Sequence, residues 1–204
     1  MFTKIIFALM TFIVVSAGAY GFDTSYKLLS VKTYDIPVYG EVNNLMVENI
    51  KTILEKVHDG DTLVLHIDSG GGDLYSAISI INSLKTKKVY IISKVERYSA
   101  SAATLITFTA NRVETSKFAI FIFHVVRITD ALGKENICGS NDTSKECTSF
   151  GYPYSVKLLT ALLTAYPNLL NALEIEKYKL GEDILITGHD LMTRTQRVTS
   201  LEKA

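Results

Sequence analysis

The chain has 204 residues, of which 48% are hydrophobic, so it is long enough to bury one sizeable core and suits a single domain. Lys and Arg together number 21, as do Asp and Glu, which gives a formal net charge of zero. This balance provides no basic field of the kind that binds nucleic acid, so we expect no nucleic-acid partner.

The first residues have the pattern of an export signal. Lys4 supplies a positive charge, residues 5–15 are almost entirely apolar, and Ala17-Gly18-Ala19 has the small residues of a cleavage site. The apolar run is shorter than the roughly 20 residues that a membrane-spanning helix needs. We therefore expect a signal peptide over residues 1–19, a mature domain over residues 20–204 without a membrane span, and a periplasmic or secreted location. An uncleaved membrane anchor is the alternative.

The mature domain is predicted to begin with a strand and a helix. Residues 31–38 have the composition of a strand, and Tyr39-Gly40 predicts the turn that ends it. Asn43 or Asn44 can cap a helix whose apolar positions extend to Val57.

A glycine-rich segment follows the next apolar run. Residues 62–67 predict a strand that leads into Asp68-Ser69-Gly70-Gly71-Gly72-Asp73, and residues 74–84 have apolar side chains at helical spacing. Residues 89–95 predict a second strand. Strand, glycine turn, helix and strand form a βαβ unit, whose two strands are parallel.

The second strand leads to a serine among small residues, and the third ends in a histidine. Ser101 lies in Ser99-Ala100-Ser101-Ala102-Ala103, where a helix can start close to the sheet, and residues 118–124 predict a strand that ends at His124. Parallel strands gather their ends at one edge, so we expect both side chains near the glycine turn. A serine nucleophile needs a base, and its oxyanion needs two N–H donors. These parts suit acyl transfer, although His124 could instead serve packing alone.

Two cysteines lie in a polar, turn-rich segment. Cys138 and Cys147 are nine residues apart, and in an oxidising compartment this spacing predicts a disulfide, with two free thiols as the alternative. No further Cys or His is close in sequence, so we predict no metal site. No phosphate-binding motif is present either, and we expect no cofactor.

The next part of the chain is predicted to be helical over residues 153–181. Residues 154–166 are strongly apolar, and Pro167 fits the first turn of another helix over residues 168–180, which Gly181 ends. Four leucines of this segment could belong to the core or to a subunit interface: Leu158, Leu159, Leu162 and Leu163.

The motifs together resemble the proteolytic subunit of the Clp protease and its relatives, most closely exported bacterial Clp-like proteins. The resemblance rests on residues 67–72, 99–103 and 121–124, with weaker support from residues 39–42 and 183–199. It implies an α/β fold of the Clp/crotonase type, a spiral of βαβ units with a mainly parallel sheet flanked by helices. Relative to that fold, residues 125–152 are an inserted loop.

The resemblance also implies a mechanism. Ser101 would be the nucleophile and His124 the general base, with the oxyanion held by the backbone N–H groups of Gly72 and Ala102. The expected reaction is hydrolysis of peptides or unfolded chains through an acyl-enzyme, by a homo-oligomer without a cofactor.

The sequence departs from the family's pattern at several positions. Gly70 replaces the usual proline, and Arg97 stands where glycine is common. The third catalytic residue is not identified: the matching position falls near Lys179, which could also indicate Ser–Lys chemistry. Other candidates lie nearby, namely Glu174, Glu176, Glu182 and Asp183. A catalytically inactive binding or scaffold protein of the same fold is therefore the main alternative, and acyl-CoA chemistry is a further one.

Overall fold

The computed structural model describes residues 30–130 and 132–201. The predicted signal peptide over residues 1–19, with its cleavage site and the alternative anchor, lies outside the described residues. Among the helices of the described ranges, none is long and apolar enough to cross a membrane.

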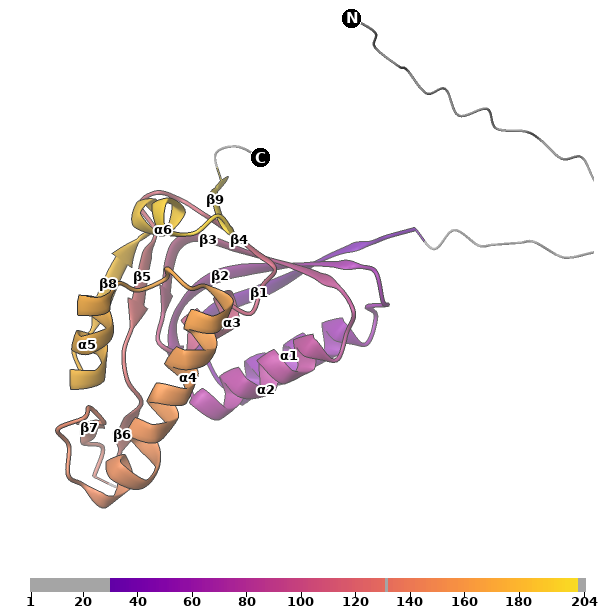
Figure 1. Ribbon diagram of the computed structural model, residues 1–204. Coiled ribbons are helices and arrows are strands. Elements are labelled where there is room, and N and C mark those ends of the chain that lie inside the picture. Colours follow the sequence, from indigo (N-terminus) through magenta and orange to yellow (C-terminus); the bar gives the residue numbers. More distant parts are fainter. Residues whose placement is uncertain (1–29, 131, 202–204) are drawn as a thin grey trace, which may run out of the picture. The chain divides into compact units, whose positions relative to one another are not determined.

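A seven-stranded, mainly parallel sheet forms the centre of this part of the chain (Figure 1). The order is β1-β2-β3-β4-β9, all parallel, while β5 pairs with the last residues of β3 in parallel and with β8 in antiparallel orientation. The expected α/β architecture is confirmed. The strands are β1 (Thr33–Val42), β2 (Thr62–Gly72), β3 (Tyr90–Ala100), β4 (Arg112–Thr115), β5 (Ile120–Phe123), β8 (Ile184–Thr187) and β9 (Val198–Ser200).

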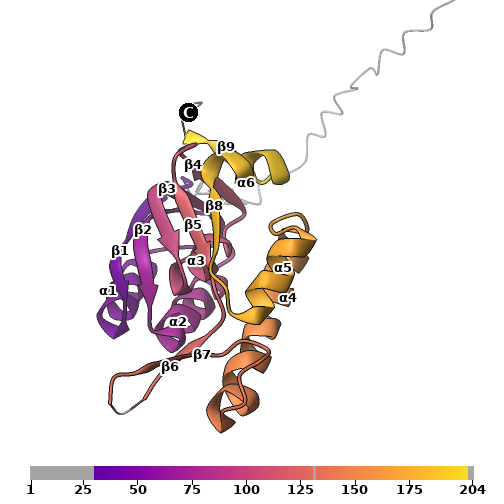
Figure 2. The same cartoon turned by 90° about the vertical axis from the view of Figure 1, so that its left-hand side faces the viewer.

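Helices flank the sheet, and α5 lies beside β8 (Figures 1 and 2). The first turns of α1 and α2 are capped by side chains that the sequence offers: Asn43 accepts a hydrogen bond from the Met46 N–H, and Asp73 accepts one from the Ser76 N–H. The helices are α1 (Asn44–Leu54), α2 (Leu74–Lys85), α3 (Ala102–Thr107), α4 (Tyr152–Ala165), α5 (Ala172–Leu180) and α6 (Gly188–Arg194).

The helix predicted from Pro167 is shorter than expected. It begins only at Ala172, because Asn171 and Glu174 form a capping box that fixes its start. Pro167 lies in the connection before it. The helix ends as predicted at Gly181, whose φ is +94°.

The strands that approach the serine run further than their apolar runs predict. The expected turn at Tyr39-Gly40 is a bulge inside β1, where the register shifts and the φ of Gly40 is +72°. The glycine segment is likewise strand, because Gly71 and Gly72 pair with Glu41 and Val42 of β1. The segment between α3 and β5 also contains a strand, β4.

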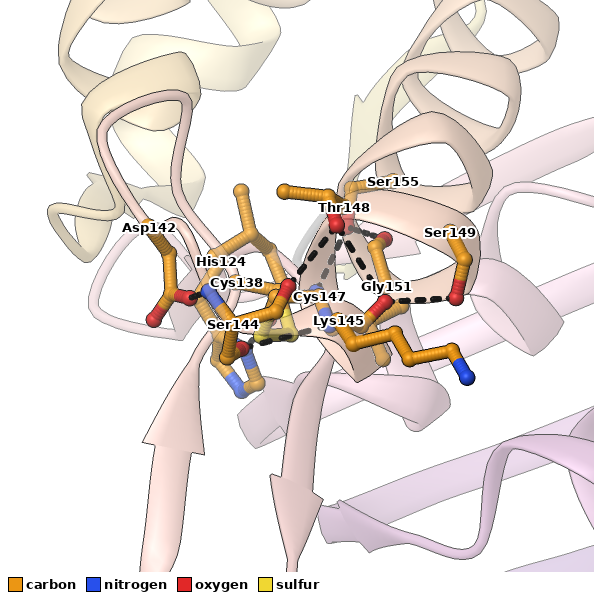
Figure 3. The surroundings of a disulfide bond; sticks show 12 residues. His124, Cys138, Asp142, Ser144, Lys145, Cys147, Thr148, Ser149, Gly151 and Ser155 are labelled. Atoms are coloured by element: carbon orange, nitrogen blue, oxygen red, sulfur yellow. Dashed lines mark hydrogen bonds between the residues drawn. A yellow bond between two sulfur atoms is a disulfide. The ribbon is translucent and has the colours of Figure 1, made fainter.

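The inserted segment contains a hairpin of β6 (Arg127–Thr129) and β7 (Glu135–Ile137), which Figure 2 shows as a projection separate from the sheet. The predicted disulfide between Cys138 and Cys147 is present, with a Cα–Cα distance of 4.8 Å and both residues fully buried (Figure 3). A π-helical turn, Cys147–Gly151, leads from the disulfide into α4. The disulfide therefore joins the end of the hairpin to the start of the helical segment.

The four leucines of α4 that the sequence could assign to the core or to an interface differ in burial. Leu159 is buried in the core, and Leu162 and Leu163 pack against the core while remaining half-exposed. Leu158 is also half-exposed and lines the cavity described below.

Candidate active site

Ser101 occupies the junction between β3 and α3 in an unusual conformation. Its φ is +54° and its ψ is −127°, and it is the one non-glycine residue with positive φ among the described residues. Its N–H donates to the Ile122 carbonyl of β5 at 2.9 Å, and its carbonyl accepts from the Thr104 N–H at 3.0 Å. A conformation of this kind costs on the order of 1–3 kcal/mol and persists only where the surroundings impose it. Such strain concentrates at functional sites.

Gly71 is pressed against the serine. A Cβ placed on Gly71 would lie 2.6 Å from the Ser101 Cβ and 2.7 Å from the Ala100 carbonyl oxygen. Its φ of +93° also favours glycine. The strand that ends in glycines therefore contacts the serine, as the sequence predicted, and this close approach is possible because Gly71 has no side chain.

The two predicted oxyanion donors lie at this junction. Gly72 and Ala102 line the same cavity as Ser101. Ala102 is the first residue of α3, so its N–H has no partner within the helix, and none of the described residues accepts from it. The neighbouring N–H group, that of Gly71, is already engaged, because it donates to Ser69 Oγ at 3.1 Å.

His124 follows β5 and lines the same cavity as Ser101. Its Nδ1 lies 2.7 Å from the Val125 carbonyl oxygen, which can only accept, so Nδ1 carries the proton in this bond. The neutral ring then has its lone pair on Nε2. Burial lowers the pKa of His124, against the effect of the carbonyl, which raises it. Within the described ranges no hydrogen bond joins Ser101 Oγ to this ring.

Asp183 lies just beyond the paired residues of β5 and β8, and its charge acts on His124. Phe123 pairs with Ile184 across antiparallel β5 and β8, and the next residues along this register are His124 and Asp183. The carboxylate of Asp183 accepts a hydrogen bond from Arg127 Nη2 at 2.6 Å. Sequence reasoning left Asp183 as one of several candidates and missed Arg127. No local pattern could have placed them, because the pairing joins segments about 60 residues apart.

The other candidates for the third residue have partners elsewhere. Glu174 pairs with Arg194 at 2.8 Å, and Glu176 pairs with Lys179 at 3.0 Å on the surface of α5. Glu182 lies 3.8 Å from Lys177. Asp183 is thus the acidic candidate that the register brings to His124.

The cavity beside Ser101 has a volume of about 840 Å³. Apolar and aromatic side chains line part of it, including Leu105, Leu158 and Phe150. The Phe150 ring stacks on Tyr75 of α2 with a centroid distance of 6.3 Å, so the inserted segment and α2 meet at the cavity. In the described parts of the chain, no three His, Cys, Asp or Glu side chains are grouped to hold a metal ion.

Comparison with known families gives one result that bears on this site. A model of the Clp protease family matches residues 18–129, more than half of the chain. The matched range contains Ser101 and His124 and ends at the last residue of β6, before the disulfide and Asp183. Comparison with curated proteins gives no match.

Proposed function

Because the chain belongs to the Clp protease family, we propose that it is a serine peptidase that hydrolyses peptides or unfolded chains. One observation carries the proposal: Ser101 is held at positive φ on the wall of a cavity that His124 also lines. Steric strain at a serine beside an imidazole favours a nucleophile over a packing residue.

In the proposed reaction Ser101 Oγ attacks a peptide carbonyl while His124 Nε2 takes the hydroxyl proton. The bond from Nδ1 to the Val125 carbonyl already sets the tautomer that this step requires. His124 then gives the proton to the leaving amine, and water hydrolyses the acyl-enzyme by the same route. The ring and the hydroxyl must first approach each other, which substrate binding can cause, since catalytic hydrogen bonds are often long in unliganded enzymes.

Backbone donors stabilise the oxyanion in this mechanism. The N–H of Ala102 supports the assignment because it is unpartnered and lines the cavity. Gly72 lines the cavity as well. The hydrogen bond to the Val42 carbonyl, at 2.8 Å, is made by the N–H of the next residue, Asp73, and not by that of Gly72.

The proposal includes a setting outside the cytoplasm. The buried disulfide between Cys138 and Cys147 suits an oxidising compartment, in agreement with the predicted signal over residues 1–19. An exported peptidase of this kind acts on peptides or on chains that are already unfolded. We also propose that the chain self-associates, which is typical of Clp proteases.

A catalytically inactive scaffold is the second candidate. It is favoured by one specific arrangement: the His124 ring is bonded to a backbone carbonyl, and the Asp183 carboxylate is bonded to Arg127. A protein that stayed in this arrangement would lack an oriented base.

Release of peptides from an unfolded polypeptide separates these candidates. We expect the wild type to release peptides and Ser101→Ala to lose this activity while keeping its fold, because its neighbours are alanines. Ser99→Ala is the matched control: Ser99 is fully buried and bonds Thr107 Oγ1 at 2.9 Å, so activity should remain. A wild type without activity would favour the scaffold, and equal activity in Ser101→Ala would show that Ser101 is not the nucleophile.

A further inference from the structure

Arg127 lies three residues after the proposed base and contacts two carboxylates. Its Nη2 donates to Asp183 Oδ1 at 2.6 Å, and its Nη1 donates to Glu135 Oε2 at 3.5 Å. The contact with Asp183 is a short, charge-assisted hydrogen bond, whereas the contact with Glu135 is at the limit of bonding distance. Arg127 therefore holds Asp183 firmly and Glu135 weakly.

Asp183 lies one residue before Ile184, which pairs with Phe123, and it is near enough to His124 for its charge to raise the pKa of the ring. A carboxylate bonded to Nδ1 would orient the imidazole and stabilise the imidazolium that forms when Nε2 takes a proton. Nδ1 is bonded to the Val125 carbonyl instead, and Arg127 engages the carboxylate. His124 and Arg127 thus compete for one acceptor.

We propose that Arg127 is a positioning residue that withholds the Asp183 carboxylate from His124, and that transfer of Arg127 to Glu135 frees Asp183 to orient the base. This inference rests on the proposed peptidase function. Activity is lower while Arg127 is bonded to Asp183, as it is in this structure, and higher when Glu135 holds the guanidinium.

Three features make such an exchange inexpensive. The side chains of Asp183 and Glu135 are 51% and 56% exposed, so water can replace either partner. The Nε of Arg127 is buried without a hydrogen-bond partner, so the guanidinium is not fully satisfied where it lies. Arg127 and Glu135 also lie on the two strands of one hairpin, which keeps Glu135 close during the exchange.

Several charged or titratable groups act on His124. Arg127 from β6 lowers its pKa, while Asp183 before β8 and Glu135 of β7 raise it. Tyr178 of α5 lines the same cavity, but its hydroxyl donates to the Ser155 carbonyl. The test must therefore separate a simple charge effect of Arg127 from an exchange of partners.

A double-mutant cycle makes this separation. The pKa of His124 is measured by NMR in the wild type, Asp183→Asn, Arg127→Gln and the double variant, with His124→Gln to assign the signal. We expect Asp183→Asn to lower the pKa of His124 by about one unit more in the Arg127→Gln background than in the wild type, because only there does the carboxylate reach the ring. An equal effect of Asp183→Asn in both backgrounds would overturn the inference.

Labelling by a fluorophosphonate probe gives the second readout. Arg127→Gln should raise the labelling rate on the order of tenfold, and Glu135→Gln should lower it by leaving Arg127 on Asp183. Lys51→Gln removes a charge from an exposed pair with Glu48 on α1 and should leave the rate unchanged.

The two measurements distinguish a failure of this inference from a failure of the proposed peptidase function. A wild type that labels, with no faster labelling in Arg127→Gln, overturns the inference and leaves the peptidase function in place. If no variant labels, the peptidase function is wrong, and the pKa cycle still decides whether Arg127 withholds Asp183.

Discussion

At the scale of single residues, the site depends on steric contacts more than on charge. The positive φ of Ser101 and the absence of a side chain on Gly71 are two aspects of one close approach between β2 and the β3–α3 junction. Ser101 lines the cavity in this strained conformation because the surrounding contacts impose it.

We predict that Gly71→Ala disturbs Ser101. The added Cβ would lie 2.6 Å from the Ser101 Cβ, so the free energy of unfolding should fall by about 1–3 kcal/mol beyond the cost of positive φ, and probe labelling should be lost. Gly60→Ala is the control, because Gly60 has a φ of +92° but no atom within 4 Å of an added Cβ. Denaturant unfolding of both variants measures the difference, and equal losses would refute the steric account.

A second prediction concerns the pH dependence of His124. Burial lowers its pKa, so the neutral base is present above that lowered value and the labelling rate should fall only as the pH drops below about 6.5. The unfolded chain binds this proton more readily, so the contribution of His124 to stability is also lost as the pH falls below about 6.5. Labelling rates measured from acid to neutral pH test this, and an apparent pKa above 6.5 would contradict it.

At the scale of elements, the inserted segment braces both sides of the base. The Cys138 N–H donates to the Val126 carbonyl at 3.1 Å, and the Ser140 N–H donates to the Lys179 carbonyl at 2.7 Å. His124 lies just before the first contact and Asp183 just after the second, and Figure 3 shows His124 among the residues around the disulfide. The disulfide loop thus connects the segments that carry both side chains.

Removal of the disulfide should weaken this brace. We expect Cys138→Ala with Cys147→Ala to lower the free energy of unfolding by roughly 2–3 kcal/mol, the loop-entropy contribution of a short closed loop. The probe should also label the variant more slowly, because the segment after His124 is less fixed. Urea unfolding and labelling rates check both parts; an unchanged free energy of unfolding would show that the disulfide is not a brace.

The elements also show what a sequence can and cannot predict. The βαβ unit and the disulfide follow from local patterns, and so does the meeting of Ser101 and His124 at one cavity. The extension of β2 through Gly72 does not, because it depends on hydrogen bonds to β1 and not on apolar residues. The sequence also could not choose among the candidates for the third position, because the antiparallel register of β8, which runs toward Asp183, is set by contacts distant in sequence.

At the scale of the whole molecule, we propose that two exposed leucines of α5 take part in the self-association. Leu173 and Leu180 are 67% and 50% exposed, and their separation of seven residues places them on one side of the helix. Apolar side chains that would be covered in an oligomer lose contact with water, which favours association.

We predict that this surface of α5 contributes to an oligomer. Sedimentation of the wild type should show a species larger than the 22.6 kDa monomer, and Leu173→Glu should shift it toward the monomer. Leu45→Glu on α1 is the matched control, since Leu45 is 69% exposed but lies on another element. A wild type that sediments as a monomer over a wide concentration range would contradict the prediction.

The most direct test of the account is the site of covalent modification by a fluorophosphonate, mapped by peptide mass spectrometry on the wild-type protein. We predict one adduct, on the peptide that contains Ser101, and none after His124→Ala at the same exposure. An adduct on another serine, or none on the folded wild type under any of the pH values at which His124 is neutral, would contradict the assignment of Ser101 as the nucleophile.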